Sequence, residues 1–171
     1  MKLSDITPNV YPTDILKDCK SGLCLFGAGF LGANDCIHMH NAKLNVTVLD
    51  IDDKKLKEME ELYPKKWTFL MSNATEWVPN TVNNGVLKWD IVSVDAPTNM
   101  FEWVRDNFDL IARLANKYLV VTMYKEIADG VADFCDNLDV ELVDKMNRSN
   151  NGLIELLVFK RAVLSKNHHR G

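Results

Sequence analysis

The sequence predicts an α/β protein built on a doubly wound, mostly parallel sheet of seven strands. Short apolar runs alternate with amphipathic segments of helical length, which is typical of parallel strands joined by crossover helices. The first run, residues 22–27, is apolar throughout, as expected for a strand covered on both faces. The last two runs, 139–145 and 153–160, have only a polar turn between them, which indicates a C-terminal antiparallel hairpin.

Periodicity and turn signals divide the chain into these elements. Strands are expected over residues 22–27, 45–50, 67–71, 90–94, 118–123, 139–145 and 153–160. Helices are expected over 11–20, 30–41, 53–63, 74–86, 99–116 and 125–137. Asp52 is expected to cap the helix over 53–63, which should face inward with Leu56, Met59, Leu62 and Tyr63. The helix over 99–116 should bury a stripe made of Phe101, Val104, Phe108, Ile111 and Leu114.

Length and composition indicate one domain over residues 1–171, with 1–20 as an N-terminal helix and lid and 162–171 as a flexible tail. The formal charge of −4 gives no broad basic field for nucleic acid or a membrane surface. No secretory signal and no apolar run long enough to span a membrane is visible, and four cysteines without a C-x-x-C pair are expected to be reduced. The sequence therefore predicts a cytoplasmic protein without a membrane segment.

A glycine loop is the sharpest local signal. Residues 27–32 match G-x-G-x-x-G between a predicted strand and a predicted helix, and Asp50 ends the next strand 18 residues after Gly32. Helix-start N–H groups favour negative ligand groups, and a carboxylate at this place can accept hydrogen bonds from ribose hydroxyls. Two cofactors suit this geometry, NAD(P) and S-adenosylmethionine. The third glycine favours NAD(P), whereas the terminal hairpin and the single-domain length favour S-adenosylmethionine.

With these motifs, residues 15–161 resemble the small class I S-adenosylmethionine-dependent methyltransferases, a Rossmann-like superfamily. The resemblance lies in Leu25-Phe26-Gly27-Ala28-Gly29, in Asp50-Ile51, in Asn73-Ala74 and in Asp95-Ala96-Pro97-Thr98. It implies that the cofactor is bound by Phe26, Gly27, Ala28, Gly29, Asp50, Ile51, Asn73, Ala74 and Asp95. Asp50 would hold the ribose, and Asn73-Ala74 would contact the adenine.

Asp95 is the candidate catalytic residue, because an acid that ends the fourth strand borders the ligand crevice of such a sheet. Capping of the following helix is the alternative role for it. Thr122 stands where ribose 2′-O-methyltransferases have a lysine, with Lys125 about three residues further on, which makes that subclass a poor match. His38 and His40 lie two apart on a predicted helix and point to different faces, so no metal site is expected.

The sequence leaves four functions open. The first is a methyltransferase that acts on a small-molecule acceptor, since no basic stripe or recognition module for nucleic acid is visible. The second is an NAD(P)-binding module without chemistry of its own. The third is a protein that binds S-adenosylmethionine but cleaves or only senses it, and the fourth is a degenerate domain that acts as a scaffold. The sequence is also compatible with a homo-oligomer, without indicating one.

Overall fold

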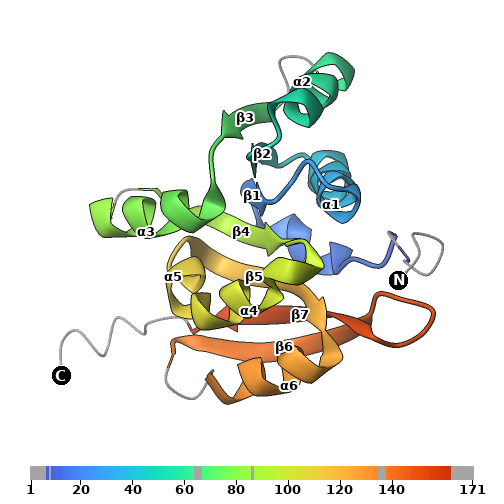
Figure 1. Ribbon diagram of the computed structural model, residues 1–171, viewed down its shortest axis with the longest axis vertical. Coiled ribbons are helices and arrows are strands. Elements are labelled where there is room, and N and C mark those ends of the chain that lie inside the picture. The colour runs from blue at the N-terminus through green and yellow to red at the C-terminus, as the bar shows by residue number, and fades with distance from the viewer. Residues whose placement is uncertain (1–6, 8, 64–66, 86, 135–137, 163–171) are drawn as a thin grey trace.

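The computed structural model describes residues 7, 9–63, 67–85, 87–134 and 138–162. Its helices are α1 Phe30–Asn41, α2 Asp53–Leu62, α3 Ala74–Asn84, α4 Phe101–Asp106, α5 Phe108–Ala112 and α6 Lys125–Phe134, with short 3₁₀ turns η2 Thr13–Asp18 and η3 Thr98–Met100. Its strands are β1 Ser21–Leu25, β2 Asn45–Asp50, β3 Trp67–Met71, β4 Trp89–Val94, β5 Ala115–Tyr124, β6 Val140–Asn147 and β7 Ile154–Arg161 (Figure 1).

The strands form one seven-stranded sheet in the order β3-β2-β1-β4-β5-β7-β6. β1 to β5 pair in parallel, whereas β7 is antiparallel to both β5 and β6 and lies between them. The predicted doubly wound sheet with a C-terminal antiparallel hairpin is therefore confirmed. The order reverses direction between β1 and β4, and ligands of open α/β sheets bind at such a reversal, beyond the carboxyl ends of the strands.

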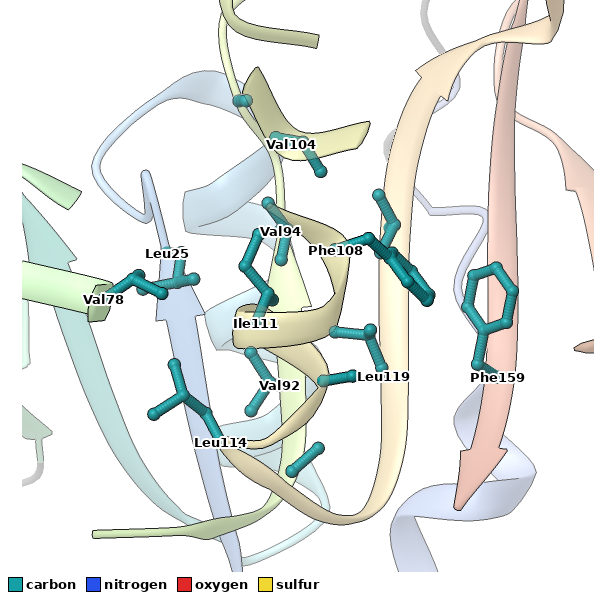
Figure 2. Close-up of a cluster of buried hydrophobic side chains, with 14 of the residues drawn as sticks. Leu25, Val78, Val92, Val94, Val104, Phe108, Ile111, Leu114, Leu119 and Phe159 are labelled. Atoms are coloured by element: carbon teal, nitrogen blue, oxygen red, sulfur yellow. The ribbon is translucent and has the colours of Figure 1, made fainter. Parts of the chain in front are cut away.

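Both faces of the sheet are covered, which explains why its central strands are apolar throughout. Leu23 and Leu25 of β1 belong to one buried cluster, and Cys24 between them belongs to the other. Residues of α3 to α6 join the first cluster, and residues of η2, α1 and α2 join the second. Figure 2 shows the first cluster, where Ile111 and Phe108 of α5 pack toward Val92 and Val94 of β4 and toward β5 and β7.

The prediction of one long helix over 99–116 is wrong, although its apolar stripe is buried as expected. The helix is interrupted at Asn107, whose φ of −113° and ψ of 19° are not helical. The Asn107 side chain donates a hydrogen bond of 2.9 Å to the carbonyl of Trp103, and such local bonds compete with continued helix. β5 then begins at Ala115, inside the range assigned to the helix.

Smaller predictions differ at element ends. Residues 11–20 contain the 3₁₀ turn η2 in place of an α-helix, and Leu62 is 75% exposed where an inward position was predicted. Asp52 does cap α2, since its carboxylate accepts a hydrogen bond from the Lys55 N–H. Cys19, Cys24 and Cys36 are buried free thiols. Most of the predicted tail and the end of the helix predicted over 125–137 lie outside the described residues.

Within the described part of the chain, no helix is long and apolar enough to cross a membrane.

Candidate functional site

A cavity of about 540 Å³ opens at the carboxyl ends of the central strands, where the strand order reverses. Its lining includes six of the nine residues that the resemblance assigns to the cofactor, namely Phe26, Gly29, Asp50, Ile51, Asn73 and Asp95. Gly27, Ala28 and Ala74 are not among the lining residues. Residues 96–101, Thr122 and Ile154 complete the side of the cavity beyond β4 and β5. The structure therefore brings most of the predicted site together at one place.

The glycine loop takes its shape from backbone geometry. Phe26 has a left-handed φ of 58°, which turns the chain sharply after β1. The Gly27 N–H donates to the Leu49 carbonyl, and a Cβ at Gly27 would lie 2.6 Å from Val48 Cγ1. The space around Gly29 is more open, because a Cβ added there would meet nothing nearer than the Phe26 carbonyl oxygen, at 3.6 Å. Gly27 is thus needed for packing, and Gly29 leaves its side of the cavity open.

Gly32 is also a packing position. A Cβ there would lie 2.5 Å from the Phe26 carbonyl oxygen and 2.7 Å from Gly27 Cα, so α1 approaches the loop as closely as its backbone allows. This contact lies within the protein and does not depend on the ligand. Close packing of the helix on the loop is also the role of the third glycine in the dinucleotide fingerprint, so Gly32 by itself does not decide between NAD(P) and S-adenosylmethionine.

We expect Gly32→Ala to lower the free energy of unfolding by about 1–3 kcal/mol, because the added methyl group meets backbone that cannot move aside. Urea titration measures this change. Gly130→Ala in α6 is the matched control, since a Cβ added there would have nothing within 4 Å. A glycine in an exposed helix is destabilising relative to alanine, so the control should gain up to about 1 kcal/mol. Equal stability of the two variants would contradict the packing role of Gly32.

Asp50 is fixed at the end of β2 by two backbone donors. Its Oδ2 accepts a hydrogen bond of 3.0 Å from the Ala28 N–H, and its Oδ1 accepts one of 2.9 Å from the Asp52 N–H. The neighbouring Ile51 is 67% exposed and lines the same cavity. Carboxylate oxygens retain acceptor capacity after one hydrogen bond each. The arrangement offers a fixed acceptor beside an exposed apolar surface.

Asn73 lines the same cavity as the N-cap of α3, one residue after Ser72, whose N–H donates to the Asp50 carbonyl. Its Oδ1 accepts hydrogen bonds from the Thr75 N–H at 3.1 Å and the Thr75 hydroxyl at 2.8 Å. Ala74, which follows it, is buried in the core. Asn73 therefore has a structural role in capping the helix in addition to its place at the cavity.

Beneath the cavity, a fully buried arginine binds two aspartates. Arg148, in the turn between β6 and β7, forms ion pairs with Asp35 of α1 and with Asp95, whose Oδ1 lies 2.9 Å from Arg148 Nη1. Nη1 also donates to the Thr122 hydroxyl at 2.7 Å. Ser93 Oγ donates to Asp35 Oδ2 at 2.7 Å. We call Asp35, Ser93, Asp95, Thr122 and Arg148 the buried cluster.

Only one carboxylate oxygen of Asp95, Oδ1, is bonded within this cluster. Its side chain is 2% exposed, and Oδ2 is buried without a hydrogen-bond partner among the described residues.

The sequence did not identify two members of the buried cluster. Arg148 was predicted only as part of a polar turn, and Asp35 was given no role. The spacing of Asp35 does indicate burial, because it lies three residues after Gly32 and four before Met39, on the buried face of α1.

Burial is the main influence on the ionisation of this cluster. It raises the pKa of Asp35 well above the ordinary value, and the nearby charge of Asp95 raises it further, against the opposing effect of Arg148. Burial disfavours the charged form of Arg148, but the two carboxylates more than offset it and raise the pKa of the guanidinium. Arg148 therefore remains charged, whereas Asp35 is the group that can take up a proton.

The two histidines of α1 have other contacts. The His38 ring stacks on Tyr11, and His40 Nδ1 accepts a hydrogen bond from the Trp67 indole N–H. Among the residues described, no three His, Cys, Asp or Glu side chains are grouped so that they could hold a metal ion. At the end of β5 it is Thr122 that lines the cavity, whereas Lys125 is the first residue of α6 and is not among the lining residues.

Comparison with solved structures identifies the fold. It is the fold of the class I S-adenosylmethionine-dependent methyltransferases. A magnesium protoporphyrin IX methyltransferase from Synechocystis PCC 6803 with bound S-adenosylmethionine is 16% identical, covers 88% of this chain and 76% of its own, and has a TM-score of 0.64. An O-methyltransferase from Bacillus cereus in complex with S-adenosylhomocysteine is 11% identical, with coverages of 91% and 83% and a TM-score of 0.61.

The Methanococcus jannaschii fibrillarin, a pre-rRNA processing protein, is 16% identical over 92% of this chain and 71% of its own, with a TM-score of 0.59. The similar folds thus include a protein of RNA processing as well as small-molecule methyltransferases. No protein-family model and no curated protein matches the sequence.

Proposed function

We propose that the protein is an S-adenosylmethionine-dependent methyltransferase with a small-molecule acceptor. The observation that carries this proposal is the position of the cavity at the reversal between β1 and β4 of a sheet whose β7 lies antiparallel between β5 and β6. Dinucleotide-binding sheets instead have the strand order 3-2-1-4-5-6. The solved structures with bound S-adenosylmethionine or S-adenosylhomocysteine share the present fold.

The residues around the cavity fit this cofactor. Asp50 offers carboxylate oxygens to ribose hydroxyls, and the exposed side chain of Ile51 offers an apolar surface to the adenine. The open side of Gly29 lets the ligand approach the backbone. A volume of about 540 Å³ lies within the range of small-molecule and cofactor sites.

When bound, S-adenosylmethionine supplies an electrophilic methyl group on a sulfonium. The contribution of this chain is alignment of the acceptor and exclusion of water. Asp95 is the candidate for contact with the acceptor, because it lines the cavity at the end of β4 and its Oδ1 is held by Arg148. A carboxylate at this place can accept the proton of a hydroxyl or amine as it is methylated.

A small acceptor is favoured by the cavity itself. Phe30, Pro97, Met100, Phe101 and Ile154 contribute apolar side chains to the lining, which suits the body of a small organic molecule. The net charge of −4 does not supply the basic surface that nucleic-acid backbones require.

A thermal-shift experiment with four ligands tests the proposal. We expect S-adenosylmethionine and S-adenosylhomocysteine at about 100 times their Kd to raise the unfolding midpoint by roughly 5–10 °C, because a ligand that binds only the folded state stabilises it. NAD and NADP should leave the midpoint unchanged. Stabilisation by NAD or NADP alone would overturn the proposal. Incubation with S-adenosylmethionine and no acceptor should give no breakdown products, and rapid breakdown would indicate a cleaving enzyme instead.

A further inference from the structure

The buried cluster forms part of the cavity wall. Asp95 and Thr122 both line the cavity, and both are hydrogen-bonded to Nη1 of Arg148. Arg148 is 0% exposed, and so is Asp35, which is bonded to the same guanidinium. Asp95 follows β4 directly, next to the loop that follows β1, so the cluster lies where the strand order reverses and the ligand is expected.

The charges of the cluster do not balance. Two buried carboxylates, Asp35 and Asp95, face one guanidinium. Of the lysines and arginines that the structure describes, Arg148 alone is paired with these carboxylates. A buried charge without a counter-charge is costly, so the surplus carboxylate needs either a proton or a second cation.

We propose that the surplus negative charge of the buried cluster is a specificity determinant that favours a cation in the cavity. On the proposed function, that cation is the sulfonium of S-adenosylmethionine. The product S-adenosylhomocysteine has a neutral thioether at the same atom, so the cluster holds the cofactor more tightly than the product. The same charge disfavours acceptors with a carboxylate or phosphate near the reacting atom and favours neutral or cationic ones.

The titratable groups next to the cluster do not change its surplus of one carboxylate. Tyr11, from the N-terminal segment, and Cys24 of β1 lie close to both aspartates, and burial raises the pKa of each, which keeps both uncharged near neutral pH. The Tyr11 ring stacks on the His38 ring, and its centroid lies 6.0 Å from Cζ of Arg148. The exchangeable proton is therefore that of Asp35.

The dependence on pH follows from this proton. At low pH Asp35 holds it, the cluster is neutral, and the cofactor and the product should bind alike. As the pH rises, Asp35 loses the proton and the affinity for the cation increases. Binding of S-adenosylmethionine near neutral pH should therefore release up to about one proton, while binding of S-adenosylhomocysteine should release none.

Calorimetric titration of the full chain with the two ligands, in buffers of different ionisation enthalpy and between about pH 5 and 8, measures both the affinities and the released protons. Asp35→Asn is the test variant, because it removes the surplus charge but keeps the size of the side chain and leaves Asp95 paired with Arg148. It should lower the ratio of the two affinities by about tenfold at the upper pH. Asp53→Asn, in the exposed ion pair with Lys57, makes the same change far from the cluster and should leave the ratio unchanged.

A ratio that does not change with pH in the wild-type protein, or that Asp35→Asn leaves unaltered, would overturn the inference while the proposed function stands. The ratio compares two ligands on the same folded protein, so partial loss of stability in the variant does not affect it. If the wild-type protein binds neither ligand, the proposed function itself fails.

Discussion

Replacing Arg148 with methionine is expected to lower the free energy of unfolding by about 3–5 kcal/mol. The guanidinium is fully buried and bonded to Asp35, Asp95 and Thr122, so its removal leaves two buried carboxylates without a cation. Urea denaturation measures the loss. The matched control is Arg105→Met, whose ion pair with Asp106 lies on the surface and should contribute less than about 1 kcal/mol.

The loss should depend on pH in a defined direction. Burial and Asp95 already raise the pKa of Asp35, and removal of Arg148 takes away the influence that opposes them. An acid whose folded-state pKa is raised contributes full stability below its unfolded pKa of about 4, and this contribution is lost as the pH rises. Arg148→Met should thus be less destabilised near pH 5 than near pH 8. The double variant with Asp35→Asn should lose less than the sum of the single variants, and strict additivity would contradict the coupling.

Asp50→Ala is expected to weaken the binding of S-adenosylhomocysteine by about 10- to 100-fold, the effect of removing a charged hydrogen-bond acceptor from a bound hydroxyl. Calorimetric titration measures the Kd directly. Loss of the bonds to the Ala28 and Asp52 N–H groups should also lower the free energy of unfolding by about 1–3 kcal/mol.

The same titration on Asp50→Asn separates these two effects. The amide oxygen can keep one of the backbone bonds, so this variant should be more stable than Asp50→Ala and still bind weakly, because the charge on the acceptor is lost. Wild-type affinity in both variants would place the ribose contact elsewhere on the cavity wall.

The sheet was predictable from the sequence because its strands are covered on both faces. Each central strand is a short apolar run, and the polar turn before β7 shows that no crossover helix joins the last two strands. Local chemistry also indicated the Asp52 cap. The helix break at Asn107 was missed because the apolar stripe continues through it, and Phe101, Val104, Phe108, Ile111 and Leu114 are all buried despite the interruption.

The part of the candidate site that lies within one sequence motif was predictable. The glycine loop and Asp50 belong to a single β-α-β unit, and their spacing in the sequence indicates a nucleotide-binding motif. The buried cluster depends on contacts between Asp35, Asp95 and Arg148, which lie far apart in the sequence. In the sequence, Arg148 is one residue of a polar turn, and only the folded sheet shows that this turn reaches under the cavity.

Equilibrium titration of the full chain with S-adenosylhomocysteine, repeated in excess NAD, tests most directly whether the cavity binds an adenosyl cofactor. We expect saturable binding of one ligand per chain, competed by S-adenosylmethionine and unaffected by NAD. Binding that NAD abolishes, or no binding by the folded protein, would contradict the proposed function.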